Sequence, residues 1–135
     1  IDIYPTLVDL CGLPRDTRKN AQGARLDGFS LRPLLEDPRA GRWPGPEAAL
    51  TMVFAGPGTA NDHTKQHWSV RTERWRYILY NNGAEELYDH DVDPYEWTNL
   101  SKLPEHDTTR RRLRAMLMKM TGLSHEPAAS ELTEQ

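Results

Sequence analysis

The sequence has 135 residues, 37% of them hydrophobic and 27% charged, with a formal net charge of −3 and a single cysteine. This length suits one domain with a modest core, and the composition excludes a chain that is disordered throughout. The nearly balanced charge argues against a nucleic-acid binder, and one cysteine excludes an internal disulfide framework. No apolar run reaches the roughly 18 residues that a membrane span needs, so no membrane association is expected.

The N-terminal segment has the apolar spacing of a helix that ends at Gly12. Asp2 is the expected N-cap of this helix. Its apolar face would comprise Tyr4, Leu7, Val8 and Cys11. Cys11 is therefore expected to pack as a small hydrophobic residue and not to act as a nucleophile. A second short helix is expected at Leu31–Glu36, capped by Ser30. Because the chain starts at Ile1, inside the first helix, we expect it to be part of a longer protein.

Beyond residue 47 the apolar period changes from that of a helix to that of a strand. The expected strands are Ala48–Phe54, His67–Thr72, Trp75–Tyr80 and Glu85–Asp89. Asn82 and Gly83 form a strong hairpin signal because both residue types tolerate positive φ. The third strand carries apolar side chains on both faces, which predicts a central position in the sheet.

A helical pattern returns from Pro104 to Thr121, with Gly122 as its expected cap. The predicted fold is α+β, with a small four-stranded antiparallel sheet, a C-terminal helix packed on it and a helical N-terminal lead-in. We expect residues 1–38 to form the lead-in, residues 39–122 to form the sheet-and-helix subdomain, and residues 123–135 to form a flexible tail.

The segment EELYDHDVDPYEWTNL raises the question of a metal site. Aspartate occupies alternate positions, namely Asp89, Asp91 and Asp93. A calcium loop of this spacing would also need glycine at its sixth position and glutamate at its twelfth, where the chain has Pro94 and Leu100. The segment therefore predicts a polar turn in which Asp91 or Asn99 caps backbone groups. Its expected packing residues are Leu87, Tyr88 and Trp97. No metal ligand is assigned within the chain.

No catalytic residue is identified, because no HExxH, GxSxG or glycine-rich phosphate motif is present. His67 opens a strand directly after the polar loop from Gly56 to Gln66, and Arg71 follows in the same strand. An imidazole and a guanidinium beside a loop suit an anionic ligand, so both are candidate substrate-binding residues. The other interpretation of His67 is a surface histidine at a strand end.

The stretches DIYPTLVDLCGLP, LDGFSLRPLLEDP, HWSVRTERWRYILY and EELYDHDVDPYEWTNL occur in this order along the chain. In order and spacing they resemble the C-terminal third of type I sulfatases, especially the iduronate-2-sulfatase-like and polysaccharide sulfatases of bacteria. The resemblance covers about residues 2–120. It implies that residues 1–38 end a catalytic α/β domain of alkaline-phosphatase-like fold, and that the sheet and helix form the C-terminal subdomain.

The resemblance also implies a sulfuric ester hydrolase that uses formylglycine and calcium, acts on sulfated carbohydrates, and is periplasmic or extracellular. The C-x-P-S-R nucleophile motif of that family is absent, because after Cys11 the proline comes one position late and no serine follows. We therefore expect calcium to be bound in the parent enzyme outside this chain, with no cofactor within it. The chain alone would be inactive and would partner an N-terminal catalytic domain. A stand-alone binding or scaffold module is the alternative.

Overall fold

The computed structural model describes residues 1–39 and 41–123. The chain forms two compact units, Ile1–Pro46 and Glu47–Gln135, and each is described by itself. The tail expected at residues 123–135 lies outside the described residues except for Leu123. Within the described ranges, no helix is both long and apolar enough to cross a membrane.

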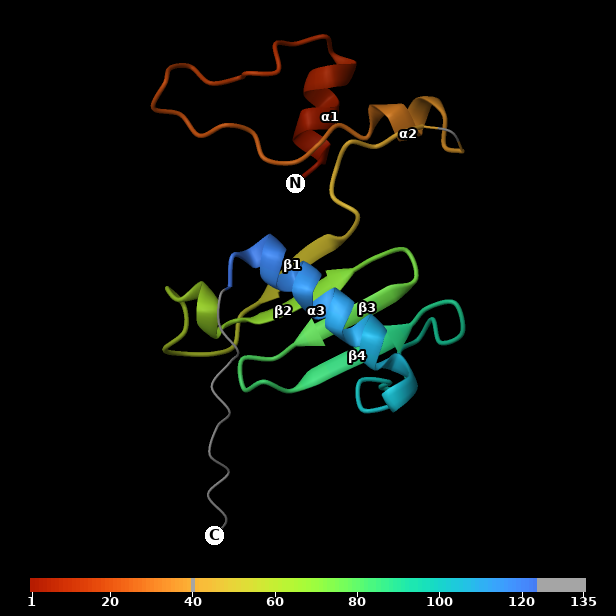
Figure 1. Cartoon of the computed structure of the whole chain (residues 1–135). Helices are drawn as coiled ribbons and strands as arrows, with labels where there is room; N and C mark the ends of the chain where they lie inside the picture. The colour runs from red at the N-terminus through yellow and green to blue at the C-terminus, as the bar shows by residue number, and fades with distance from the viewer. Residues whose placement is uncertain (40, 124–135) are drawn as a thin grey trace. The chain divides into compact units, whose positions relative to one another are not determined.

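The N-terminal unit contains two helices, α1 (Ile3–Leu10) and α2 (Arg32–Glu36), joined by a long loop (Figure 1). The polar side of α1 holds the start of the second helix in place. Asp2 Oδ1 accepts the Phe29 N–H at 2.8 Å, Thr6 Oγ1 accepts the Leu31 N–H at 2.9 Å, and Asp9 Oδ2 accepts the Ser30 hydroxyl at 2.7 Å. These bonds tie together segments more than twenty residues apart.

Two expectations for this unit are wrong. Asp2 stands at the N-cap position of α1, but its side chain makes no capping bond, because the carboxylate is used by Phe29. Cys11 is exposed and does not pack in this unit. The expected cap of α2 is partly right, since Ser30 Oγ accepts the Arg32 N–H at 3.2 Å although Leu31 is the N-cap residue.

The second unit is built on an antiparallel meander. Its strands are β1 (Ala49–Val53), β2 (His67–Arg71), β3 (Trp75–Leu79) and β4 (Glu85–Asp89), in the spatial order β1-β2-β3-β4. The four predicted strands are confirmed, as is the interior position of β3, which pairs with both β2 and β4. Val70, Tyr77 and Leu87 stand opposite one another across these three strands and so share one face.

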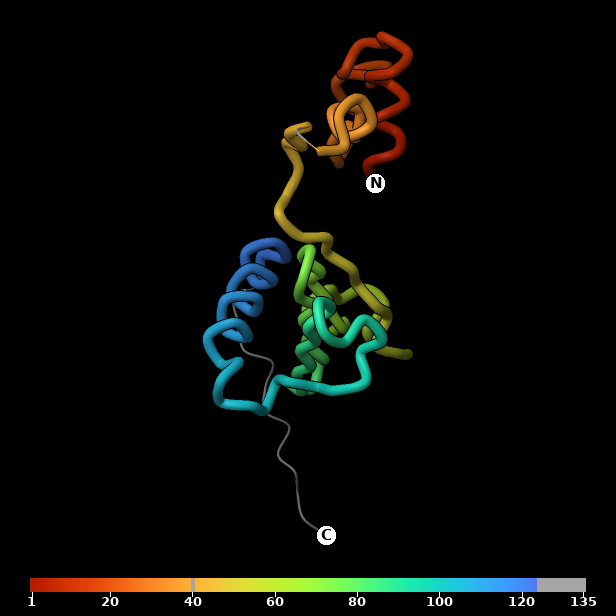
Figure 2. The backbone as a smooth tube through the Cα atoms, turned by 90° about the vertical axis from the view of Figure 1, so that its right-hand side faces the viewer, coloured from red at the N-terminus to blue at the C-terminus, as the bar shows by residue number. Residues whose placement is uncertain are grey.

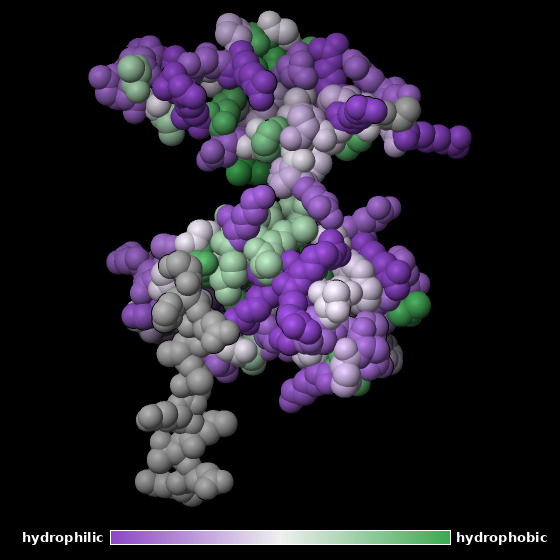
Figure 3. Space-filling view, in the orientation of Figure 1, coloured by the Kyte–Doolittle hydropathy of each residue, from purple (hydrophilic) through white to green (hydrophobic). Residues whose placement is uncertain are grey.

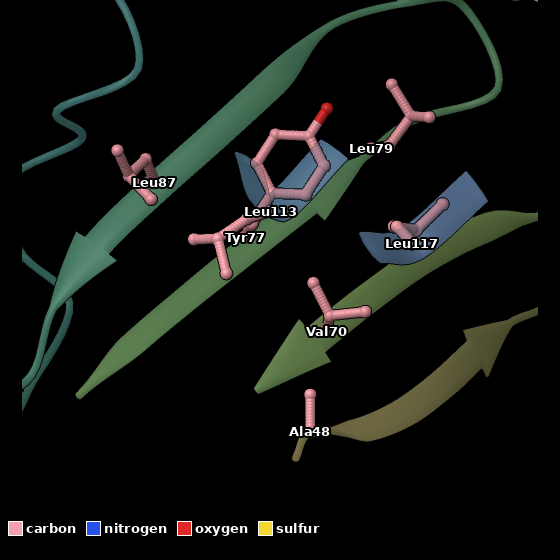
Figure 4. Packing of buried hydrophobic residues seen from close by; sticks show 7 residues of the cluster. All are labelled: Ala48, Val70, Tyr77, Leu79, Leu87, Leu113 and Leu117. Carbon is pink, nitrogen blue, oxygen red and sulfur yellow. The ribbon is translucent and has the colours of Figure 1, made fainter. Parts of the chain in front are cut away.

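That face is covered by α3 (Asp107–Thr121), which lies across the sheet in Figures 1 and 2. The buried core consists of Ala48, Val70, Tyr77, Leu79, Leu87, Leu113 and Leu117 (Figure 4). A short 3-10 helix, Pro104–His106, precedes α3, and Gly122 ends it with φ of 69°, as predicted. Much of the outward side of α3 is hydrophilic in Figure 3, so the helix buries one stripe and exposes the other.

The hairpin between β3 and β4 is a three-residue loop, Asn81–Gly83. The Tyr80 N–H donates to the Ala84 carbonyl at 2.9 Å, and the Gly83 N–H donates to the Tyr80 carbonyl at 3.0 Å. Gly83 has φ of 85°, whereas Asn82 does not adopt positive φ. The predicted turn is therefore confirmed, with the left-handed conformation confined to the glycine, as a three-residue hairpin requires.

The segment after β4 folds back along the free edge of that strand. Asn99 Oδ1 accepts the Leu87 N–H at 3.1 Å, and the Leu100 N–H donates to the Leu87 carbonyl at 2.8 Å. These bonds confirm the predicted capping role of Asn99 and shield the edge from other strands. Trp97 is 85% exposed, so the expectation that it packs is wrong. Glu96, with φ of 59°, turns its carboxylate inward and leaves the next side chain outside.

Candidate functional site

The candidate site lies at the end of the sheet where β2 begins and β3 ends. The His67 ring packs edge-on against Tyr80, with 5.1 Å between ring centroids and 65° between planes. Its Nδ1 accepts the Asn81 backbone N–H at 3.1 Å. The hairpin that follows β3 therefore fixes the orientation of the first side chain of β2.

The loop that leads into β2 is organised by Gln66, a residue that is 3% exposed. Its amide nitrogen donates to the carbonyls of Thr59 and Asp62, and its amide oxygen accepts the Ala55 N–H at 3.0 Å. The Thr59 hydroxyl lies within 3.5 Å of the same oxygen. Because this one buried amide has partners on both its donor and acceptor sides, it closes the polar loop into a defined shape.

Arg71 lies at the opposite end of β2 from His67, on the same face of the sheet. His67 and Arg71 are four positions apart in the strand, which separates their backbones by about 13 Å at roughly 3.3 Å per residue. The Arg71 guanidinium donates to the backbone carbonyls of Thr72 and Glu73, at 2.8 Å in the second case. The two candidate residues thus share a face but do not meet, and the role of each stays a prediction.

On the face of the sheet that points away from α3, two carboxylates bind polar side chains. They belong to Glu86 and Glu96. Glu86 accepts the hydroxyls of Tyr80 at 3.1 Å and Tyr88 at 2.9 Å. Burial, reinforced by the Glu86 carboxylate, raises the pKa of Tyr88 to about 12 and also raises the pKa of Tyr80. Both phenols therefore remain protonated near neutral pH and act as donors, so neither offers a base.

Glu96 forms the second of these groups. It accepts the Arg76 guanidinium at 2.9 Å, and its other oxygen lies 2.7 Å from His90 Nε2. Figure 2 shows the segment that carries Glu96 on the side of the sheet away from α3. The carboxylate thereby fastens the loop after β4 onto the sheet.

The three alternate aspartates are already engaged by protein groups. Asp89 is buried and paired with Arg74 at 2.6 Å, and the hydrogen bond from that arginine lowers the Asp89 pKa. Asp91 lies 3.3 Å from the same guanidinium, whereas Asp93 accepts the Thr98 N–H at 2.8 Å. Across residues 1–39 and 41–123, no three His, Cys, Asp or Glu side chains are grouped as a metal ion would require. The calcium expected from the resemblance has no fitting ligand set here and stays a prediction about the parent enzyme.

Sequence reasoning missed the residues that fix the candidate site. Gln66 acts through its buried side-chain amide, and Asn81 acts through its backbone N–H. Neither role can be recognised from residue type or spacing. A glutamine in front of a strand, between polar residues, was the one available signal. It identifies a loop boundary without revealing burial.

A four-stranded antiparallel meander, covered on one face by a C-terminal helix, defines the second unit as a small α+β unit. Residues 1–122 match the family model described as N-sulphoglucosamine sulphohydrolase, C-terminal, and the chain belongs to this family. Both the family resemblance and the fold class predicted from sequence are thereby confirmed.

Individual relatives agree with this assignment. Arylsulfatase K of Gallus gallus is 35% identical over 113 residues, which cover 78% of this chain and 19% of that protein. The N-acetylglucosamine-6-O-sulfatase of Bacteroides thetaiotaomicron is 29% identical over 121 residues, covering 87% of this chain and 20% of that protein. The solved structure of BT4656 in complex with its substrate D-glucosamine-2-N,6-O-disulfate has a TM-score of 0.63 and 26% identity, over 94% of this chain and 25% of that one. The chain thus spans about a fifth of the length of the curated relatives it matches.

Proposed function

We propose that this chain is the C-terminal portion of a sulfatase whose complete protein hydrolyses sulfate esters of sulfated carbohydrates. The observation that carries the proposal is the family match over residues 1–122. A relative that binds a sulfated glucosamine as its substrate supports the carbohydrate class. The short share of each relative that the chain spans supports its being one part of a larger enzyme.

In this proposal the reaction takes place on residues outside the chain. Formylglycine would be the nucleophile and calcium the cofactor, both supplied by the catalytic domain. The chain itself contributes structure and part of the wall of the substrate pocket. Residues 1–38 would complete the catalytic domain, and residues 39–122 would be the C-terminal subdomain. The isolated chain would then have no sulfatase activity.

The surface of α1 supports a large partner of this kind. The apolar side chains of α1 that remain exposed are Ile3, Tyr4, Leu7 and Leu10. Figure 3 shows hydrophobic side chains at the surface of this N-terminal unit. An apolar surface of this kind on a short helix is typical of an interface that another part of the protein covers. The remaining catalytic domain is the partner we propose for it.

His67 is the first residue of this chain that we propose to line the substrate pocket, and Arg71 is the second candidate. His67 is half-buried and stands next to a polar loop whose shape is fixed by Gln66. Such a loop on a rigid sheet is a common location for ligand contacts. The role of Arg71 would be to supply positive charge along the same face.

The proposal is tested by the coding sequence upstream of Ile1. We expect the same reading frame to contain a C-x-[PA]-S-R nucleophile motif and an Asp-rich metal motif. A reading frame that starts close to Ile1 would contradict the proposal and would favour the alternative, a stand-alone binding or scaffold module.

A further inference from the structure

We propose that His67 is a fixed hydrogen-bond donor, which presents its Nε2–H to an oxygen atom of the bound substrate. This inference rests on the proposed function and gives the histidine a defined chemical role in it. His67 would bind and orient the substrate, and it would not serve as a general base.

The tautomer follows from the partner of the ring. Nδ1 accepts the Asn81 backbone N–H at 3.1 Å, so this nitrogen must carry a lone pair and not a proton. A neutral imidazole has one protonated nitrogen, which is then Nε2. The backbone of the β3–β4 hairpin, which cannot change its own protonation, thereby selects the Nε2–H form.

The ring is also held in one orientation. Tyr80 packs against its edge at 5.1 Å between centroids, and the Tyr80 hydroxyl is itself bound to Glu86 at 3.1 Å. His67 Nε2 has no hydrogen-bond partner among the described residues, while the side chain is half-buried. A donor that is oriented by its neighbours and left without a protein acceptor is ready to bind a ligand acceptor.

The surroundings favour an oxygen acceptor. The loop beside His67 contains two glycines with positive φ, Gly56 and Gly58, and the space where a Cβ would stand is open at both. Of the ionic groups near the start of β2, Lys65 is paired with Asp62 at 3.3 Å and Glu86 is bound by two phenols. A sulfate oxygen or a sugar hydroxyl would accept the Nε2–H without competing with these pairs.

A role as general base does not fit this arrangement. The Nδ1 lone pair is occupied by Asn81, and Nε2 already carries the hydrogen. Neither ring nitrogen then offers a free lone pair to a substrate. Substrate binding is therefore the step in which His67 would act.

The hydrogen bond can be tested in the 135-residue chain with a matched pair of variants. In Asn81→Pro the N–H donor is removed, and proline suits the first central position of this turn. Asn81→Ala keeps the N–H and is the control. We expect a scalar coupling across the hydrogen bond between the Asn81 backbone nitrogen and His67 Nδ1 in ¹⁵N spectra of the wild type and of Asn81→Ala, but not of Asn81→Pro. Absence of this coupling in the wild type would overturn the inference.

The substrate role is tested in the complete protein encoded by the reading frame that contains this chain. The probes are N-acetylglucosamine 6-sulfate and an aryl sulfate that carries no sugar. His67→Ala should raise KM about tenfold and leave kcat nearly unchanged, as expected for the loss of one hydrogen bond to substrate. His67→Gln, which retains an N–H donor at similar reach, should restore KM. An effect on both probes assigns the acceptor to the sulfate group, and an effect on the sugar probe alone assigns it to the carbohydrate.

Two failures can be told apart. If the complete wild-type protein releases no sulfate from either probe, the proposed function fails and the substrate role of His67 fails with it. If the wild type is active and His67→Ala has wild-type KM on both probes, the inference alone is overturned. A fall in kcat with unchanged KM for His67→Gln would show that His67 acts in the transition state and not in substrate binding, which also contradicts the inference.

Discussion

Removal of the Glu85 carboxylate should strongly destabilise the second unit, because this group joins the sheet to α3. Glu85 accepts the Tyr77 hydroxyl at 2.5 Å and the Arg114 guanidinium at 2.7 Å, and it also binds Arg110. Tyr77 is fully buried, so within the described residues Glu85→Ala leaves its hydroxyl with only the distant Arg114 contact at 3.4 Å.

The size of this effect follows from what is lost. Breaking a fully buried ion pair costs about 3–5 kcal/mol. The side chains of Arg110 and Arg114 retain 24% and 22% of their exposure and can regain water, which favours the lower end of that range. We expect the free energy of unfolding to fall by about 3 kcal/mol in Glu85→Ala and by about half as much in Glu85→Gln, which keeps one acceptor oxygen.

Urea unfolding of the 135-residue chain at neutral pH, followed by tryptophan fluorescence, measures this loss at constant m-value. Glu73→Ala removes an exposed carboxylate from the turn before β3, and should change the free energy by no more than about 0.5 kcal/mol. A loss below about 1 kcal/mol in Glu85→Ala would refute the reasoning.

The same carboxylate predicts a pH dependence of stability. Burial alone would raise the pKa of Glu85, but the hydrogen bonds from Tyr77, Arg114 and Arg110 outweigh it and lower the pKa. Because the pKa is lower in the folded than in the unfolded chain, the stabilisation is complete above the unfolded value of about 4.3 and is lost as pH falls through the folded value. The difference between wild type and Glu85→Ala should therefore shrink in acid, and a constant difference would contradict this account.

Three further variants test other parts of the fold. Leu117→Ala empties a fully buried position between α3 and the sheet, and should lower the free energy of unfolding by about 3 kcal/mol; a loss under 1 kcal/mol would place Leu117 outside the core. Gln66→Leu leaves the loop carbonyls without donors, so trypsin should cleave after Lys65 faster than in the wild type, and an unchanged rate would argue against the role of this amide. Gly122→Ala forces a Cβ into φ of 69° and should cost about 1 kcal/mol in urea unfolding, and an unchanged free energy of unfolding would contradict this role of the glycine.

The meander could be predicted because its determinants are local. Apolar alternation marks β2 and β3, and Asn82-Gly83 marks the turn between β3 and β4. A helix with one apolar stripe next to such a sheet leaves one arrangement that buries both surfaces, with α3 on the face of Tyr77. These elements therefore followed from pattern and turn chemistry alone.

The errors arise where a residue serves a distant segment. Asp2 has the sequence position of a helix cap, but its carboxylate is used by Phe29, whose return to α1 no local pattern reveals. Trp97 has the composition of a core residue, yet the inward turn of Glu96 leaves it at the surface. Residue type therefore gave the wrong prediction at these two positions, because hydrogen bonds to distant residues determine which side chains cap and which are buried.

The candidate site was only partly accessible from sequence. His67 could be selected because a histidine follows a polar loop and opens a strand. The tautomer that makes it a donor depends on Asn81, fourteen residues away, and the shape of the loop depends on the burial of Gln66. The tautomer and the loop shape both depend on the register of the strands, because the register determines the backbone groups that lie next to each side chain.

The most direct test of the central claim is a measurement of sulfate release from an aryl sulfate, with and without calcium. The complete protein that contains this chain should release sulfate, whereas the 135-residue chain should not under either condition, because the proposed nucleophile and metal ligands lie outside it. Turnover by the 135-residue chain itself, or none by the complete protein, would contradict the account.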